Sequence, residues 1–153
     1  MTIWHRTGLA VLSGLFLVLG FAGFGYFPLI WVFLVPVLFA VSGTTPRRAF
    51  WIGLLFGTVG SVGGYFWLAG TLDRFTPLPT AVCWGLMFLG CAWLGTLFAC
   101  LLGMVRVAEA KLAIAPVWVL AVVYPALELV FPNLFPYHIG ASQYRFSLIT
   151  QIV

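Results

Sequence analysis

Charged residues are scarce in this sequence. Only 7 Lys or Arg and 3 Asp or Glu occur among 153 residues, so 7% of the chain is charged, whereas about a quarter of the residues of a soluble domain carry charge. Hydrophobic residues make up 63% of the chain. A folded chain of this composition cannot cover its apolar side chains with polar surface. A water-soluble globular protein is therefore excluded, and the apolar surface must face lipid.

Acidic residues are fewer than basic residues, so the formal net charge is +4. Proteins that bind nucleic acid gather their basic residues into one patch or stripe. Here the basic residues are spread over several separate points of the chain: Arg6, Arg47, Arg48, Arg74, Arg106, Lys111 and Arg145. We therefore expect no nucleic-acid partner and interpret these residues as signals of membrane topology.

Cysteines are also few, and their spacing carries no metal motif. Cys83, Cys91 and Cys100 are odd in number, form no C-x-x-C pair and lie in one apolar run. No His, Lys or Arg within that run could lower the pKa of a thiol and make it a nucleophile. We expect the three residues to pack as small hydrophobic side chains, with no structural disulfide, no metal site and no cofactor.

Long apolar runs separate the charged residues, and a hydrocarbon slab of about 30 Å needs roughly 20 such residues per helix. The runs and their breakers predict helices at about 8–25, 28–41, 49–70, 80–105 and 112–131, a loop at 132–145 and a further apolar segment from 146. The predicted fold is all-α: one transmembrane domain over 1–153, a polytopic helix bundle of about five helices plus the start of a sixth. A cleaved signal peptide is the alternative for the first run, but no A-x-A site follows it.

The basic residues also predict an orientation, because short loops rich in Lys and Arg stay on the cytoplasmic side. With a cytoplasmic amino terminus, five basic residues fall inside and two fall outside. The inside group is Arg6, Arg47, Arg48, Arg106 and Lys111, and the outside group is Arg74 and Arg145. The loop 132–145 is then extracytoplasmic.

Small residues recur along one side of two predicted helices. Gly53, Gly57, Gly60 and Gly64 share a side of the third helix, and Cys91, Gly95, Ala99 and Gly103 repeat every four residues on the fourth. Small side chains let helix backbones approach closely inside a membrane. We expect these two helices to pack together. The alternative is that the glycines line a substrate path.

Glu128 is the one ionisable residue inside a predicted helix run. A carboxylate near the bilayer centre costs about 2.5 to 3.5 kcal/mol on insertion scales, so such residues usually face a partner or a wet cavity. Glu128 is therefore a site candidate. The alternative is that it lies near the outer end of its helix, where it stays hydrated.

The loop 132–145 is dense in Pro, Gly and aromatic residues, which indicates a shaped interfacial loop. Ser142, His138 and Glu128 could in principle act as nucleophile, base and orienting carboxylate. No G-x-S-x-G elbow accompanies Ser142, so residue types alone are weak grounds for that chemistry.

The same loop, with the helix before it, resembles a known family. Pro136, Gly140, Ser142 and Gln143, following a helix that contains Glu128, are similar to the FPW...GYSQ signature of bacterial apolipoprotein N-acyltransferases. Further similar positions are residues 24–32, Val35, Pro36, Arg47, Arg48, Ala49, Phe50, Gly53, Phe56, Gly57, Trp67, Leu68, Pro116 and Trp118. The resemblance therefore extends over essentially the whole chain, and its strength lies in order and spacing.

The resemblance implies an enzyme of lipoprotein biosynthesis in the bacterial cytoplasmic (inner) membrane. Family members transfer an acyl chain from a membrane phospholipid to the amino-terminal diacylglyceryl-cysteine of an apolipoprotein. They do so through a thioester on a nitrilase-like extracytoplasmic domain with a Glu, Lys and Cys triad. These 153 residues contain no such domain. We expect no catalytic residue in this chain, no activity from it alone, and a catalytic domain supplied in cis or in trans.

In this interpretation the chain is a membrane base that admits lipid chains sideways and contributes to the rim of the site. The rim residues that the resemblance suggests are Glu128, Pro136, Gly140, Ser142 and Gln143. Two other functions stay open: a non-catalytic membrane scaffold or lipid-binding protein, and a small transporter component. A transporter favours paired interrupted helices and intramembrane charges, and only Glu128 offers the latter.

Overall fold

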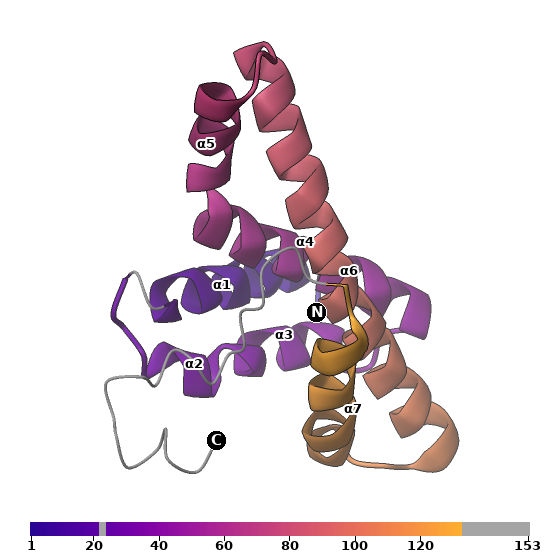
Figure 1. Cartoon of the computed structure of the whole chain (residues 1–153). Coiled ribbons are helices and arrows are strands. Elements are labelled where there is room, and N and C mark those ends of the chain that lie inside the picture. Colours follow the sequence, from indigo (N-terminus) through magenta and orange to yellow (C-terminus); the bar gives the residue numbers. More distant parts are fainter. Residues whose placement is uncertain (22–23, 133–153) are drawn as a thin grey trace, which may run out of the picture.

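The structure is a computed structural model that describes residues 1–21 and 24–132, and every regular element in these ranges is a helix (Figure 1). The helices are α1 (Ile3–Gly20), α2 (Leu29–Val32), α3 (Leu34–Val41), α4 (Pro46–Tyr65), α5 (Trp67–Phe75), α6 (Thr80–Leu112) and α7 (Pro116–Val130). The all-α expectation is confirmed for this part of the chain. The predicted loop residues 133–145 and the apolar segment 146–153 lie outside the described residues.

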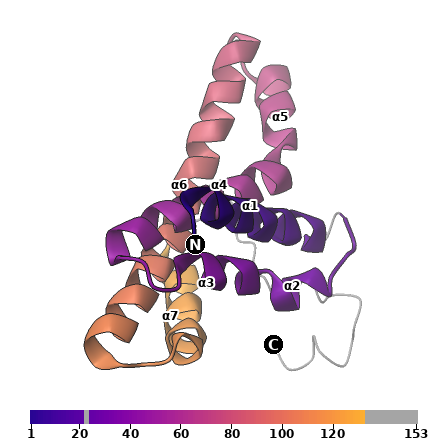
Figure 2. The ribbon, with the colours of Figure 1, turned by 180° about the vertical axis from the view of Figure 1, so that it is seen from behind.

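The helices form a bundle from which one helical pair projects. In Figures 1 and 2, α1, α3, α4, α7 and the carboxyl-terminal half of α6 make the body, while α5 and the first half of α6 form an arm that stands away from it. The arm has a small core of its own, made by Ala69 of α5 with Met87 and Cys91 of α6. The bundle body therefore contains the main core and, as shown below, the candidate site.

Phe56 of α4 lies at the centre of the main core. It is fully buried, and its ring contacts those of Phe33 and Phe98 with centroid separations of 6.0 and 4.8 Å. Ser13 of α1 is the buried polar residue that joins two helices, because its hydroxyl accepts a hydrogen bond of 2.8 Å from the Val37 N–H of α3. Aromatic packing and this hydrogen bond together fix α1, α3, α4 and α6 around one centre.

The predicted packing of the two glycine-bearing helices is confirmed for part of each row. A Cβ at Gly53 would lie 2.5 Å from the Phe98 carbonyl oxygen, and one at Gly57 would lie 2.8 Å from Gly95 Cα. The backbones of α4 and α6 therefore touch where small residues allow it. Gly60 and Gly64 instead face Leu17 and Phe21 of α1, because the row winds around α4. Gly103 also faces α4, but less closely, since a Cβ there would lie 3.9 Å from the Pro46 carbonyl oxygen.

Several predicted helix ends are also wrong. The predicted helix 8–25 corresponds to α1, which stops at Gly20, before a turn in which Gly25 has a φ of +79°. The predicted helix 80–105 corresponds to α6, which continues through the charged segment 106–111 to Leu112 and is followed by Ala113 with a left-handed φ of 51°. The predicted helix 112–131 corresponds to α7, which begins only at Pro116, since proline suits the first turn of a helix and lacks the N–H that a later position would need.

The helix predicted at 49–70 is two helices. α4 ends at Tyr65, α5 begins at Trp67, and their axes are bent by 56°. Gly63 and Gly64 lie just before the bend, and small-residue pairs are a common cause of helix kinks. The predicted helix 28–41 is similarly interrupted at Phe33, between α2 and α3.

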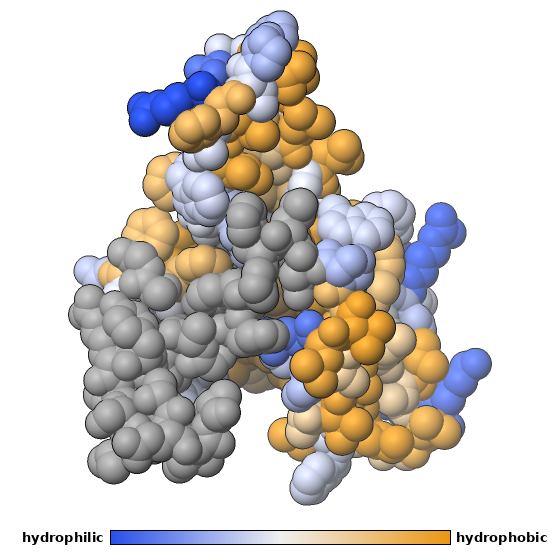
Figure 3. Space-filling model, in the orientation of Figure 1, coloured by the Kyte–Doolittle hydropathy of each residue, from blue (hydrophilic) through white to orange (hydrophobic). Residues whose placement is uncertain are grey.

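Apolar helices dominate the described part, although fewer of them match a full membrane span than expected. α1 and α6 are long and apolar enough to cross a bilayer, and the bent pair α4–α5 would make a third span. Leu29–Val41 and Pro116–Val130 are shorter apolar helices. The expected count of five full spans is therefore not reproduced within residues 1–21 and 24–132. The surface is widely apolar, as the space-filling view shows (Figure 3).

Basic residues gather where α3 ends and α4 begins, which we call the basic end. Arg6 of α1 donates to the carbonyls of Ala40 and Ser42, and Arg106 Nε of α6 donates to the Thr44 carbonyl at 2.9 Å. These cations bind carbonyls at the carboxyl end of α3, which carries partial negative charge. Arg47 and Arg48 lie in the first turn of α4, beside the same segment. Four of the five residues assigned to one membrane side thus lie close together.

Candidate functional site

Glu128 lies on α7, one turn after Tyr124, and is half-buried. The Tyr124 hydroxyl donates a hydrogen bond of 3.3 Å to Glu128 Oε1. Residues four apart on a helix lie one above the other on the same face, so the pair forms a single polar patch on an otherwise apolar helix. α7 packs on α6, and Tyr124 stacks on Phe98 of that helix with ring centroids 6.1 Å apart. The patch therefore faces the bundle and not the lipid.

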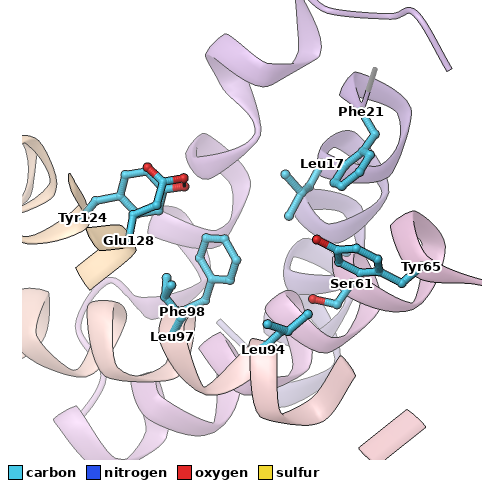
Figure 4. Close-up of a pocket in the computed structure, with 10 residues that line it drawn as sticks. Leu17, Phe21, Ser61, Tyr65, Leu94, Leu97, Phe98, Tyr124 and Glu128 are labelled. Carbon is cyan, nitrogen blue, oxygen red and sulfur yellow. Dashed lines mark hydrogen bonds between the residues drawn. The ribbon is translucent and has the colours of Figure 1, made fainter. Parts of the chain in front are cut away.

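A cavity of about 70 Å³ lies beside this patch, between α1, α4, α6 and α7. Figure 4 shows Tyr124 and Glu128 on one side of it, Ser61 and Tyr65 of α4 on the other, and Phe98 between them. The remaining lining is mainly apolar: Leu17, Phe21, Gly60, Leu94 and Leu97. A bound water needs at least about 10 to 15 Å³ of such cavity volume. The cavity therefore has room for a few waters or one small polar group.

Ser61 and Tyr65 were not among the residues that the sequence indicated. They are four residues apart, so both side chains lie on one face of α4, and Ser61 is only 8% exposed. Their spacing was available as a signal, but hydroxyl residues are common in membrane helices. Only the packing of α4 opposite α7 shows that they share a cavity with Glu128.

The start of the loop 132–145 is held on α6 by Trp93. The indole Nε1 donates to the Pro132 carbonyl at 3.4 Å, and the Trp93 and Phe131 rings have centroids 5.6 Å apart. The position from which the chain leaves α7 is thus set by packing on α6, close to Leu94 of the cavity wall. This role of Trp93 was not predicted from the sequence.

The other candidate residues of the sequence, Pro136, Gly140, Ser142 and Gln143, lie outside the described residues, as does His138. The structure therefore does not test a set formed by Ser142, His138 and Glu128. Among residues 1–21 and 24–132, no group of three or more His, Cys, Asp and Glu side chains could hold a metal ion.

The three cysteines all lie in α6 and are free thiols. Cys83 and Cys91 are buried and Cys100 is half-buried. The nearest polar contact of Cys91 Sγ is Met87 Sδ at 3.6 Å, and that of Cys83 Sγ is the Leu78 carbonyl at 3.9 Å. Neither contact supplies the base or cation that an active thiolate needs. Both environments agree with a packing role.

An all-helical described region, apolar helices of membrane-spanning length and a small polar cavity inside the bundle define the class as a helical membrane protein. Residues 13–153 match the model of the apolipoprotein N-acyltransferase N-terminal domain, and the chain belongs to that family. It is 31% identical over 103 residues to an apolipoprotein N-acyltransferase of Geobacter metallireducens. The aligned part is 67% of this chain and 20% of the relative, so the chain spans about a fifth of that protein's length.

Proposed function

We propose that this chain is the membrane-embedded base of an apolipoprotein N-acyltransferase. In this proposal the complete enzyme moves an acyl chain from a membrane phospholipid to the amino-terminal diacylglyceryl-cysteine of a lipoprotein. The observation that supports it most is the family match, which spans residues 13–153 and so includes Glu128 and the loop 132–145. A protein that kept only a general helical membrane fold would have no reason to match over this loop.

The proposed reaction has two steps, both on a catalytic domain outside this chain. A cysteine thiolate attacks the ester carbonyl of the phospholipid, which forms a thioester and releases the lysophospholipid. The free amino group of the lipoprotein cysteine then attacks the thioester, which forms an amide and returns the thiol. The contacts of Cys83 and Cys91 supply no base or cation for this nucleophile. The chain's own contribution is to position the reacting partners.

The cavity and the start of the loop lie at a depth that suits this role. Leu94 precedes Arg106 by twelve residues on α6, which is roughly 18 Å of helix rise. If the basic end marks the cytoplasmic boundary, the Glu128 cavity lies in the outer half of a hydrocarbon core of about 30 Å. The loop then follows on the extracytoplasmic side of the inner membrane. We propose that Glu128 and the loop residues Pro136, Gly140, Ser142 and Gln143 form the membrane side of the substrate site.

A chimera tests this proposal. The matching membrane region of the Geobacter metallireducens relative is replaced by residues 1–153, and mass spectrometry of a reporter lipoprotein detects the added amide-linked acyl chain. We expect the chimera to acylate the reporter in cells depleted of their own enzyme. Gly140→Val and Gln143→Ala should each lower that acylation by about tenfold or more, because a glycine suits a tight turn or a close backbone approach.

Two controls separate loss of function from loss of the protein. The first control is that the membrane level and helicity of each variant equal those of the unmodified chimera. The second is the Gly85→Ala variant, whose new methyl group on the arm meets nothing within 4 Å. This variant of the chimera should acylate the reporter normally. A chimera that inserts correctly but leaves the reporter unacylated would show that this chain is not a functional membrane base. Normal acylation by both loop variants would show that the loop is only a connector.

A further inference from the structure

A second, larger hollow lies at the basic end, between α1 and α4, and no part of the proposed reaction uses it. Its volume is about 370 Å³. We call it the α1–α4 groove, and its lining residues are Met1, Ile3, Arg6, Thr7, Arg48, Trp51, Ile52 and Leu55. Ile3, Arg6 and Thr7 follow the three- and four-residue spacing of one helix face, and so do Arg48, Trp51, Ile52 and Leu55. Two helix faces therefore flank the groove.

The groove exists because α1 and α4 are in close contact only farther along. A Cβ at Gly14 would lie 2.7 Å from Val59 Cγ1, and one at Gly60 would lie 2.5 Å from Leu17 Cδ2. Such spacing is possible only with glycine. Toward the amino ends of both helices, the groove is lined by larger side chains, among them Arg6, Arg48 and Trp51. Trp51 is 58% exposed.

The groove combines a cationic rim with an apolar wall. Arg6 is held in place by its hydrogen bonds to the Ala40 and Ser42 carbonyls. The Arg48 guanidinium makes no hydrogen bond or ion pair in residues 1–21 and 24–132, although the Arg48 backbone N–H is bonded to Thr45 Oγ1. No acidic residue lines the groove. An anion that enters therefore meets two guanidinium groups and no opposing carboxylate.

We propose that the α1–α4 groove binds one anionic phospholipid of the leaflet at the basic end. Arg48 and Arg6 bind the phosphodiester, and the first part of an acyl chain lies along Trp51, Ile52 and Leu55. The choice of ligand follows from charge complementarity and from surroundings, since basic pockets between membrane helices bind anionic lipid head groups. This lipid is distinct from the proposed acyl donor, because it lies at the opposite end of α1 and α4 from the Glu128 cavity. The inference does not depend on the proposed function.

Arg47 provides a matched control. It neighbours Arg48 in the first turn of α4 and carries the same charge, but it lines a different groove between α4 and α6, with Phe50, Gly103 and Met104. A general attraction of anionic lipid to the basic end would depend equally on both arginines. Of these two arginines, a lipid bound in the α1–α4 groove depends on Arg48 and not on Arg47.

The test places the full chain in phosphatidylcholine vesicles that contain dibrominated phosphatidylglycerol, which quenches nearby indoles. The signal of Trp51 is the difference between the protein and its Trp51→Phe variant. We expect half-quenching of Trp51 at an about fivefold lower fraction of brominated phosphatidylglycerol than of brominated phosphatidylcholine. Arg48→Gln should remove this preference, Arg48→Lys should keep most of it, and Arg47→Gln should leave it unchanged.

Two results would overturn the proposal. One is equal quenching of Trp51 by the two brominated lipids in the protein with both arginines intact, a comparison that needs only the Trp51→Phe reference and no arginine variant. The other is an equal loss of preference in Arg47→Gln and Arg48→Gln, which would indicate diffuse surface charge. Far-ultraviolet circular dichroism of each variant shows whether its helices are intact.

Discussion

At the scale of single residues, Glu128 shows how a bundle accommodates a carboxyl inside an apolar helix. Facing lipid, this group would cost a few kcal/mol. The structure instead turns it toward a cavity that contains three hydroxyls, those of Ser61, Tyr65 and Tyr124. Glu128 also lies in the last turn of α7, which ends at Val130, so a position that faces the cavity and one near the helix end are compatible. Its role in the proposed substrate site stays a prediction.

Glu128→Gln separates the charge of this residue from its shape. The amide keeps an oxygen that can accept from the Tyr124 hydroxyl, so the level of inserted protein should change little. Hydrogen bonds to charged groups contribute about 1.5 to 3 kcal/mol, so we expect lipoprotein N-acylation by the chimera to fall by about tenfold or more. The matched control is Glu109→Gln at the basic end, which removes an exposed ion pair with Arg106 and should leave acylation unchanged. Equal acylation by both variants would assign Glu128 a purely structural role.

At the scale of helices, α4 has two features, of which only one was predicted from the sequence. Its contact with α6 through Gly53 and Gly57 could be predicted, because rows of small residues have a well-defined use in membranes. The bend after Tyr65 was not predicted, because the run 49–70 contains no proline and the pair Gly63 and Gly64 was assigned to helix packing. Charge placement was also misleading on α6, where Arg106 and Glu109 pair within a continuing helix instead of ending it.

The same limits apply to the site. Glu128 could be found because a lone charge in an apolar run is rare. Ser61, Tyr65 and Trp93 could not, because each acquires its role only from a partner on another helix. Sequence spacing shows which residues share a face of one helix, whereas helix packing decides which faces meet.

Replacement of glycines on α4 and α6 tests the importance of backbone contact. Gly53→Ala places a methyl group 2.5 Å from the Phe98 carbonyl oxygen and 2.9 Å from Ala99 Cα, both backbone atoms that cannot move aside. We expect a loss of about 1 to 3 kcal/mol in the free energy of unfolding, measured by denaturation in mixed micelles. Gly85→Ala on the arm meets nothing within 4 Å and should be neutral or stabilising by up to about 1 kcal/mol. A stability loss in Gly53→Ala no greater than in Gly85→Ala would contradict close packing of α4 on α6.

At the scale of the whole molecule, the chain has two chemically different ends. Arg6, Arg47, Arg48 and Arg106 gather at the basic end, whereas α5 carries Asp73 and Arg74 at the far end of the arm. α1 and α4 both start at the basic end and run side by side, as the contacts of Gly14 and Gly60 show. α3 and α6 lead back to the basic end, where α3 meets Arg6 and α6 carries Arg106, so α1, the α2–α3 pair, α4 and α6 alternate in direction. Positive charge is therefore concentrated at one end, which the positive-inside rule predicts to be cytoplasmic.

Reporter fusions test the resulting topology. Fusions after Arg48 and after Lys111 should report the cytoplasm, because both positions adjoin the basic end, where retained basic residues oppose translocation. Fusions after Asp73 and after Asn133 should report the extracytoplasmic side, since Asp73 lies at the end of the α4–α5 pair that leaves the basic end. Alkaline phosphatase and green fluorescent protein at each position give complementary readouts. The opposite pattern at either pair would reverse the orientation and move the loop 132–145 to the cytoplasmic side, away from the proposed catalytic domain.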